Sequence, residues 1–510
     1  MTGAMFEPEL EAFAADYDAG RAGLVVTRLV GDLETPVSAY LKLSRERTGA
    51  TFLLESVEGG AARGRYSMIG LDPDVLFRAV GEKAEINRDA LTDRDAFKPC
   101  DAPPLVALRQ LIAESAVPAR MQLPPMAAGV FGYLGYDMVR QMERLAAPKE
   151  DKIGVADALL MRPTVMVVFD TVKDEISIVT PVRPRDGVTA KAAYESALAR
   201  LDRIVATLEA PLDHRDSGCD PQLVAAEPVS NTPKARFLEM VERAKEYIRA
   251  GDIFQVVLSQ RFTAPFALPA FALYRALRRV NPAPFLCFLN FGDFQIVCSS
   301  PEILVRVADG KVTIRPIAGT RWRADDKAED ERLAAELLAD EKERAEHLML
   351  LDLGRNDVGR VARTGTVRVT DSFTIERYSH VMHIVSNVEG ELDDSRLDCI
   401  DALAAGFPAG TVSGAPKVRA MEIIDELETD KRGIYGGCIG YFGSGGQMDT
   451  CIVLRTAIVK DGKMHVQAGA GVVYDSEPEY ENRECVNKAK ALFRAAEEAV
   501  RFAARSRRGQ

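Results

Sequence analysis

Two carboxylates and one ammonium group stand at helical spacing in the segment EYENRECVNKAK, residues 479–490. Glu481, Glu484 and Lys488 are separated by three and four positions, so a helix would carry them on one face. The common form of such a face is a solvated surface with exposed ion pairs. The alternative is a binding site in which the carboxylates hold a cation and the ammonium group holds an anion. The other charged residues of the chain decide between the two.

Two further features favour an anionic ligand. The segment VQAGAGVVYDS contains Gly469 and Gly471, and we expect a glycine loop whose backbone amides approach an anion closely. Arg455 stands inside the apolar run CIVLRTA, where a surface arginine is not expected. The glycines alone are a weak signal, because no strand, GxGxxG and helix unit surrounds them.

A second acidic segment, DEKERAEHLMLLDLGRND, carries Glu343 and Glu346. A hard cation such as Mg²⁺ prefers carboxylate oxygens and keeps several of its waters. Two acidic helices, an amide loop, an arginine and a lysine could therefore hold a dianion through a bridging magnesium ion. Mg²⁺ is the cofactor that this pattern predicts.

Four residues in three other motifs are candidates for acid–base work or for lining a substrate. Glu302 ends SSPE, Gly319 and Thr320 lie in PIAGTR, and His383 lies in SHVMHIVS. Each has a plain structural interpretation: a helix start, a turn and a buried core histidine. Their combination makes Glu302 and His383 candidates for proton transfer. The chain has no GxSxG, phosphate-loop or HExxH motif.

The composition is that of a soluble globular protein. The chain has 510 residues, enough for two to four domains, with 47% hydrophobic and 28% charged residues. A net charge of −11 argues against nucleic acid as the main partner. No apolar run approaches the roughly 18 residues of a membrane span, and no signal peptide is evident. Eight cysteines without a CxxC pair are typical of a reduced, cytoplasmic protein.

The N-terminal part, residues 1–209, reads as strands with one long helix at its end. The segment 210–233 is rich in Asp, Pro and Ser and is expected to connect it to a C-terminal catalytic region, residues 234–510. The patterns predict strands at 23–30, 51–56 and 76–80, a hairpin over 163–182 and a helix over 190–209.

The C-terminal part reads as many strands with helices in blocks, which predicts an α+β fold. Its first helix is expected to begin at Thr232 as N-cap, with Pro233 in the first turn. Its last helix is expected to begin at Ser476, with Glu479 completing a capping box. A charged helix is predicted over 327–351, and strands over 253–263, 285–290, 294–299, 303–307, 311–316, 438–442, 450–459 and 464–468.

The motifs resemble those of the chorismate-binding enzyme family, and within it the large subunits of anthranilate synthase. The resemblance covers nearly the whole chain, and so many long motifs in one order are very specific. The matching segments are LLES (53–56), GDIFQVVLSQRF (251–262), SSPE (299–302), PIAGTR (316–321), EHLMLLDLGRNDVGR (346–360), SHVMHIVS (379–386), FPAGTVSGAPKVRAMEII (407–424), CIVLRTA (451–457), QAGAGVVYDS (467–476) and ECVNKAKAL (484–492).

This resemblance implies a two-part sandwich of largely antiparallel sheets with helices packed outside. It implies that Glu346 and Glu484 ligate magnesium, with Glu481 nearby through water. The residues that it implies around chorismate are Gly319, Thr320, Thr411, Tyr435, Arg455, Gly469, Ala470, Gly471 and Lys488. Chorismate has two carboxylates, which the local positive groups would offset.

The resemblance also implies a lyase reaction in the first step of tryptophan biosynthesis. Ammonia would attack ring carbon 2 of chorismate while Glu302 protonates the leaving hydroxyl at carbon 4. The aminated intermediate would then lose pyruvate, assisted by His383, with Thr320 beside the substrate. The separate subunit expected to release the ammonia is a glutamine amidotransferase, so we expect a hetero-oligomer.

Two positions distinguish the relatives. Family members that add water carry a lysine base where this chain has Gln255, which cannot deprotonate water. Aminodeoxychorismate synthases often carry a nucleophilic lysine where this chain has Ala318. Two alternatives stay open: component I of aminodeoxychorismate synthase, and a catalytically inactive scaffold or tryptophan-sensing subunit.

A feedback site is implied by the motifs LLES and NPAPFLCF. By the resemblance, L-tryptophan would bind there as an inhibitor. The residues implied are Glu55, Ser56, Pro284, Phe285, Leu286 and Cys451. Without the resemblance, LLES would be taken as a simple edge strand.

Overall fold

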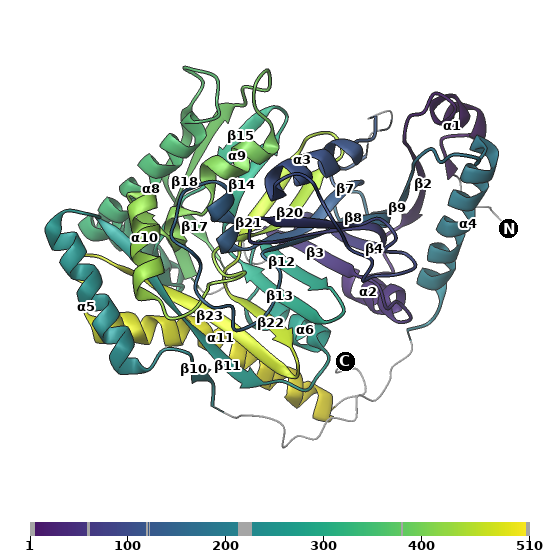
Figure 1. Cartoon of the computed structure of the whole chain (residues 1–510). Helices are drawn as coiled ribbons and strands as arrows, with labels where there is room; N and C mark the ends of the chain where they lie inside the picture. Colours follow the sequence, from purple (N-terminus) through teal and green to yellow (C-terminus); the bar gives the residue numbers. More distant parts are fainter. Residues whose placement is uncertain are drawn as a thin grey trace.

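The computed structural model describes residues 6–58, 62–118, 121, 123–212, 227–378 and 381–505 (Figure 1). Every strand pair within these ranges is antiparallel, and helices and strands are present in similar amounts. The predicted α+β class is therefore confirmed.

Two long strands, β4 (Ala62–Val80) and β8 (Ala158–Asp170), pair with each other and divide the sheet into two halves. The early part of β4 and the late part of β8 belong to the first half-sheet, and the opposite ends belong to the second. The other strands of the first half-sheet are β1 (Phe6–Glu7), β2 (Gly23–Val30), β3 (Thr51–Glu58), β9 (Glu175–Val182), β10 (Val229–Ser230), β11 (Gln255–Pro265), β12 (Phe285–Asn290), β13 (Phe294–Ser300), β19 (Gly414–Ala415), β22 (Thr456–Lys460) and β23 (Lys463–Val472).

The second half-sheet carries most of the predicted acid–base residues. Its strands are β5 (Lys83–Asn87), β6 (Lys98–Pro99), β7 (Gly129–Leu134), β14 (Ile303–Ala308), β15 (Lys311–Ile314), β16 (Ile317–Trp322), β17 (Arg368–Arg377), β18 (Val381–Glu391), β20 (Cys438–Gly443) and β21 (Met448–Ile452).

An apolar core joins residues of both half-sheets, and helices cover the outer faces, as expected of a sandwich. The first half-sheet packs on α1 (Leu10–Tyr17), α2 (Pro36–Ser44), α4 (Ala190–Glu209), α6 (Ala270–Val280) and α11 (Pro478–Arg505). The second packs on α3 (Pro104–Glu114), α8 (Glu341–Gly359) and α9 (Cys399–Gly406). The remaining helices are α5 (Lys234–Ala250) and α10 (Lys417–Leu427) against β11, and α7 (Lys327–Ala339) against β18.

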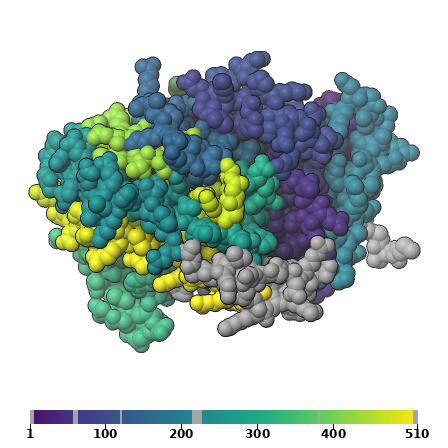
Figure 2. Space-filling model, turned by 60° about the horizontal axis from the view of Figure 1, so that its bottom comes forward, coloured from purple at the N-terminus to yellow at the C-terminus, as the bar shows by residue number. Residues whose placement is uncertain are grey.

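Strands from both sides of the predicted connection pair with one another. β3 pairs with β12, and β7 pairs with β20. Figure 2 shows the purple surface of the N-terminal region against the teal and yellow surface of the C-terminal region. The division at 210–233 stays a prediction, and residues 213–226, with Cys219, lie outside the described ranges. No helix in those ranges is both long and apolar enough to span a bilayer.

The predicted strands at 23–30 and 285–290 and the helix over 190–209 are confirmed with the same bounds. Two longer predictions are wrong. The helix over 327–351 is interrupted at Asp340, whose carboxylate accepts hydrogen bonds from the amides that open α8. The strand over 450–459 is interrupted at Arg455, whose φ of +47° is incompatible with a continuous strand.

Two predicted helix caps are also wrong. Pro233, not Thr232, takes the position before α5. Ser476 Oγ accepts from the Val473 amide, and α11 starts only at Pro478. Glu479 forms an ion pair with Lys234 in place of a capping box. The Thr232 hydroxyl instead contacts Asn231 and Thr429, so in each case another partner engages the side chain that was expected to cap the helix.

A buried ion pair fixes the short helix η3 (Gly410–Val412) to the first half-sheet. The Arg432 guanidinium donates to both Glu428 oxygens and to the carbonyls of Val412 and Val257. Glu428 in turn accepts from the Ser259 amide and hydroxyl. Both charges are thus fully hydrogen-bonded, as burial requires.

We predict that Arg432→Met destabilises the protein by about 3–5 kcal/mol, because it leaves the Glu428 carboxylate buried without its partner. The measurement is the midpoint of urea denaturation. Arg332→Met, on an exposed pair with Glu329, is the matched control and should leave the midpoint unchanged. Equal midpoints for both variants would contradict the prediction.

Candidate active site

The candidate site lies where the chain crosses between the half-sheets. Glu302 lies on the crossing from β13 to β14, and Arg455 lies on the crossing from β21 to β22. The two crossings are fastened by backbone bonds: the Ile452 amide donates to the Glu302 carbonyl (3.0 Å), and the Ser299 amide donates to the Arg455 carbonyl (3.2 Å). Residues that are far apart in sequence therefore share one place.

Glu302 is a buried carboxyl that is kept protonated. Its side chain is 7% exposed, and burial raises its pKa to about 8 despite the nearby hydroxyl of Thr411. The Thr411 Oγ1 lies 3.4 Å and 3.3 Å from the two carboxyl oxygens. A neutral carboxyl near neutral pH can donate a proton, as the sequence analysis predicts for this residue.

Arg455 presents a positive charge to the same space. Within the described residues, its guanidinium has no hydrogen bond or ion pair to a side chain or carbonyl. Burial lowers its pKa, while Tyr378 and Glu302 act in the opposite direction. An arginine stays charged even so, which leaves its planar donor group available for a carboxylate.

His383 on β18 is held in one tautomer by the neighbouring strand. Its Nδ1 lies 2.7 Å from the Gly319 carbonyl, so Nδ1 carries the hydrogen and Nε2 keeps a lone pair. Burial lowers the pKa of His383, which favours the neutral ring. Thr320 Oγ1 lies 3.2 Å from the same nitrogen. The structure thus brings together the predicted residues His383, Thr320 and Gly319. Gly319 has a φ of +68° and lies where the register between β16 and β18 shifts.

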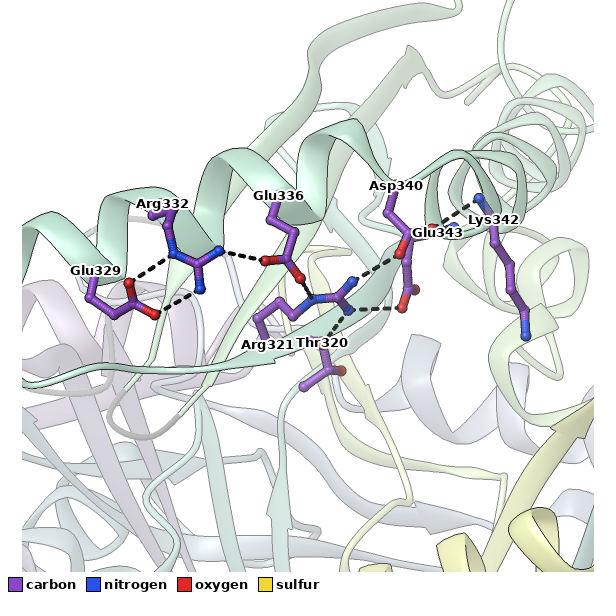
Figure 3. A network of polar contacts seen from close by, with 8 residues as sticks. All are labelled: Thr320, Arg321, Glu329, Arg332, Glu336, Asp340, Lys342 and Glu343. Carbon is purple, nitrogen blue, oxygen red and sulfur yellow. Dashed lines mark hydrogen bonds and ion pairs between the residues drawn. The ribbon is translucent and has the colours of Figure 1, made fainter.

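Arg321 fastens this irregular stretch of β16 to two helices, as Figure 3 shows. Its guanidinium lies 3.4 Å from Glu336 on α7, 2.8 Å from Asp340 and 3.2 Å from Glu343 on α8. It also donates to the Thr320 carbonyl at 3.1 Å. Arg321 therefore links the position of Thr320 to the start of the helix that carries Glu346.

The predicted metal ligands approach from α8 and α11. Glu346 accepts a hydrogen bond from the side-chain amide of Gln255 at 3.2 Å. Burial and the charges of Glu343 and Glu484 raise the pKa of Glu346, so the two helices bring their carboxylates close enough to repel. Burial and Glu484 likewise raise the pKa of Glu481.

These three carboxylates fit a hard cation, although they are not drawn into a compact set. Within the described ranges, the ligand oxygens of Glu346, Glu481 and Glu484 do not all lie within 4.8 Å of one another. Lys488 pairs with Glu484 at 2.6 Å and donates to the Gly469 carbonyl at 2.9 Å. Mg²⁺ would relieve the repulsion between these carboxylates by binding their oxygens, either directly or through a water ligand.

The predicted glycine loop is wrong, because Gly469, Ala470 and Gly471 lie inside β23, paired with β11. The missing side chains make room for two neighbours. A Cβ on Gly469 would lie 2.8 Å from the Tyr435 hydroxyl, and one on Gly471 would lie 2.7 Å from Gln255 Nε2. Both glycines thus let buried polar groups lie against the strand.

The predicted feedback residues lie on paired strands. Ser56 on β3 is opposite Phe285 on β12, and Glu55 is opposite Leu286. Pro284 immediately precedes β12. Cys451 lies on β21, and its sulfur is within 4.8 Å of that of Cys287, the neighbour of Leu286.

Sequence reasoning missed three residues that support these sites. Arg278 binds both Glu55 oxygens, at 2.7 Å and 3.0 Å. Tyr378 packs its ring 5.5 Å from that of His383. Arg321 holds Thr320 as described. Arg321 ends the quoted motif PIAGTR, which could have pointed to it. Arg278 and Tyr378 lie outside the quoted motifs, and no local pattern marks them.

A cavity of about 1750 Å³ lies elsewhere, between α2, α4 and α6. None of the predicted catalytic, substrate or metal residues lines it. This cavity is therefore separate from the candidate site, which lies at the two strand crossings.

The chain belongs to the chorismate-binding enzyme family, because the family model described as chorismate binding enzyme matches residues 51–494. Component 1 of anthranilate synthase from Cereibacter sphaeroides is 56% identical over 500 residues, which cover 98% of this chain and 99% of that protein. The protein of the same name from Thermus thermophilus is 48% identical over 472 residues, covering 92% and 96%.

Solved structures agree with this assignment. Anthranilate synthase component I from Streptococcus pneumoniae TIGR4 superposes with a TM-score of 0.74 at 37% identity, covering 91% of this chain and 98% of that one. The menaquinone-specific isochorismate synthase from Escherichia coli has a TM-score of 0.68 at 20% identity, covering 94% and 95%, and shares the fold. The resemblance that the motifs predicted is confirmed.

We predict that turnover of chorismate with ammonia falls as the pH rises through about 8, because the acid form of Glu302 is lost there. The rate should be expressed per concentration of unprotonated ammonia, which itself rises with pH. Glu302→Gln should lower kcat by about 100-fold to 10,000-fold and remove the break. A wild-type profile that stays flat from pH 7 to beyond about 9 would contradict this assignment.

Proposed function

We propose that this protein is the aminating subunit of an anthranilate synthase, converting chorismate and ammonia to anthranilate, pyruvate and water. The observation that carries the proposal is the buried Glu302, whose pKa burial raises to about 8, near the Arg455 guanidinium, which has no ion pair among the residues that the structure describes. The pair offers an acid for a leaving hydroxyl and a cation for a substrate carboxylate in one dehydrated space. The family and the named relatives support an enzyme that acts on chorismate.

The first step is substitution of the hydroxyl on ring carbon 4. Glu302 gives its proton to that oxygen, which leaves as water while ammonia bonds to ring carbon 2 and the two ring double bonds shift toward carbon 4. The ammonium group that forms then loses one proton to solvent. Arg455 and Tyr435 hold the enolpyruvyl carboxylate, and Thr411 keeps the Glu302 carboxyl oriented at 3.3–3.4 Å. The resulting carboxylate of Glu302 is stabilised by the nearby positive charge of Arg455.

The second step removes pyruvate and makes the ring aromatic. A proton must leave ring carbon 2, and the Nε2 lone pair of neutral His383 can accept one. Glu346, Glu484 and, through water, Glu481 would hold Mg²⁺, with Lys488 and the β23 backbone beside the ring carboxylate. Magnesium, when bound, withdraws charge from that carboxylate.

Gln255 and Ala318 favour ammonia over the other nucleophiles of the family. The Gln255 amide donates to Glu346 and has no basic nitrogen with which to activate water. Ala318 is a buried methyl group beside Gly319 and offers no nucleophile. Component I of aminodeoxychorismate synthase remains the second candidate, and its product would keep the pyruvyl carbon skeleton on the ring.

The ammonia is proposed to come from a separate glutamine amidotransferase subunit, and the complex to be cytoplasmic. The relatives named component 1 support a second component. L-Tryptophan is proposed as an inhibitor at Ser56, Pro284, Phe285, Leu286 and Cys451. Glu55 is already engaged by Arg278 and Tyr274, so it would shape this site through them.

We predict that the purified chain forms a fluorescent anthranilate product from chorismate, ammonia and Mg²⁺, but not from chorismate, glutamine and Mg²⁺. L-Tryptophan should lower the rate. A product that retains the enolpyruvyl group would favour aminodeoxychorismate synthesis. No turnover with any nitrogen source, in a folded sample, would favour an inactive scaffold.

We predict that EDTA abolishes this turnover and that Mg²⁺ restores it. Glu484→Gln should raise the half-saturating Mg²⁺ concentration by about tenfold or more, because one anionic oxygen donor is lost. Glu497→Gln, an exposed site on the same helix, is the control and should leave that concentration unchanged. An unaltered Mg²⁺ requirement in Glu484→Gln would remove Glu484 from the ligand set.

A further inference from the structure

Three buried cysteines from three strands meet in the core between the half-sheets. They are Cys287 on β12, Cys298 on β13 and Cys451 on β21, and their sulfur atoms all lie within 4.8 Å of one another. Their exposed fractions are 4%, 0% and 1%. Among the residues that the structure describes, no other trio of His, Cys, Asp or Glu side chains is so compact. The amination reaction uses no thiol.

The arrangement differs from that of the other buried cysteines. Cys287 and Cys298 are direct cross-strand partners in the first half-sheet. Cys451 reaches them from the second half-sheet, through the core that both share. All three thiols are free. Cys399, Cys438 and Cys485 are also buried, but none of them belongs to a close group of potential ligands in the described part of the chain.

The three sulfurs lie in a dry core and share weak hydrogen bonds. Cys298 Sγ donates to the Leu454 carbonyl at 3.8 Å, so Cys298 is a thiol here. Hydrogen bonds among the neighbouring sulfurs, together with burial, raise the pKa values of Cys287 and Cys451. A cation that replaces the thiol protons would offset the negative charge that deprotonation creates in this core.

We propose that Cys287, Cys298 and Cys451 form a binding site for one copper(I) ion. Soft sulfur ligands select soft ions, and copper(I) accepts a sulfur-only environment. Sulfurs about 2.3 Å from a central ion lie about 4 Å from one another, so the trio needs only a small contraction. Binding forms copper–sulfur bonds while the coordinating thiols release their protons to the solvent, without any change of oxidation state.

Occupation of this site is expected to inhibit the enzyme, and this part rests on the proposed function. Cys298 lies on β13, two residues before that strand ends and leads into Glu302, and Cys451 lies on the strand that leads into Arg455. Drawing the three sulfurs together pulls on both crossings at once. Because the catalytic arrangement depends on the spacing of these crossings, a small displacement there lowers turnover.

The binding test uses the full, reduced, metal-free chain titrated with copper(I) without oxygen, in competition with a coloured copper(I) chelator. We expect one ion per chain and a new ultraviolet absorption from sulfur-to-copper charge transfer. Cys298→Ala should weaken copper binding by more than about 100-fold, because a direct ligand is lost and the loss of a supporting group alone costs up to about that much. Cys438→Ala is the matched control: Cys438 is buried on the adjacent strand β20 and packs in a different core, so binding should persist.

The outcomes separate the two claims. Equal copper affinity in the wild type, Cys298→Ala and Cys287→Ala, each shown to be folded by circular dichroism, would overturn the site. Loss of anthranilate formation on loading the wild type, with resistance in Cys298→Ala, would support the inhibitory role, and full turnover at one bound ion would overturn it. Copper binding is measured without chorismate, so a failure of the proposed amination leaves its result intact.

Discussion

The site depends on keeping a carboxylic acid and a guanidinium close together without letting them form an ion pair. Direct pairing with Arg455 would lower the pKa of Glu302 and remove the proton that the chemistry needs. The two residues lie on different strand crossings, which backbone bonds from Ile452 and Ser299 tie to each other. The backbone therefore sets the separation, and burial supplies the protonation state.

The surrounding elements maintain this spacing by different means. Arg432 and Glu428 fasten η3, and with it Thr411, to β11. Arg321 ties the irregular end of β16 to α7 and α8, so that Thr320 and Glu346 are positioned by one set of charges. Gly469 and Gly471 yield space to Tyr435 and Gln255. Two of these contacts, Arg432 with Val257 and Gly471 with Gln255, join segments more than a hundred residues apart.

That distance explains which features the sequence could predict. Periodicity is local, and it predicted the helix 190–209 and the strands 23–30 and 285–290 with their observed bounds. The motifs identified the family and grouped Glu302, Thr320 and His383. The break at Asp340 follows from a local N-cap, whose signal the continuous charged pattern concealed. Local patterns could not reveal the left-handed backbone of Arg455 or the strand conformation of residues 469–471, because tertiary contacts decide both. The partners Arg278 and Tyr378 escaped for the same reason.

The unbroken run of β4 and β8 through both half-sheets has a consequence for motion. A hinge motion between the half-sheets would have to break the backbone hydrogen bonds between β4 and β8, which extend along almost the whole of both strands. Rigid-body opening of the sandwich is therefore costly, and access for small molecules must come from rearrangement of peripheral helices. The junction of α7 and α8 is held in part by the partly exposed charge pairs of Arg321, which salt can screen, so we expect it to loosen as the ionic strength rises.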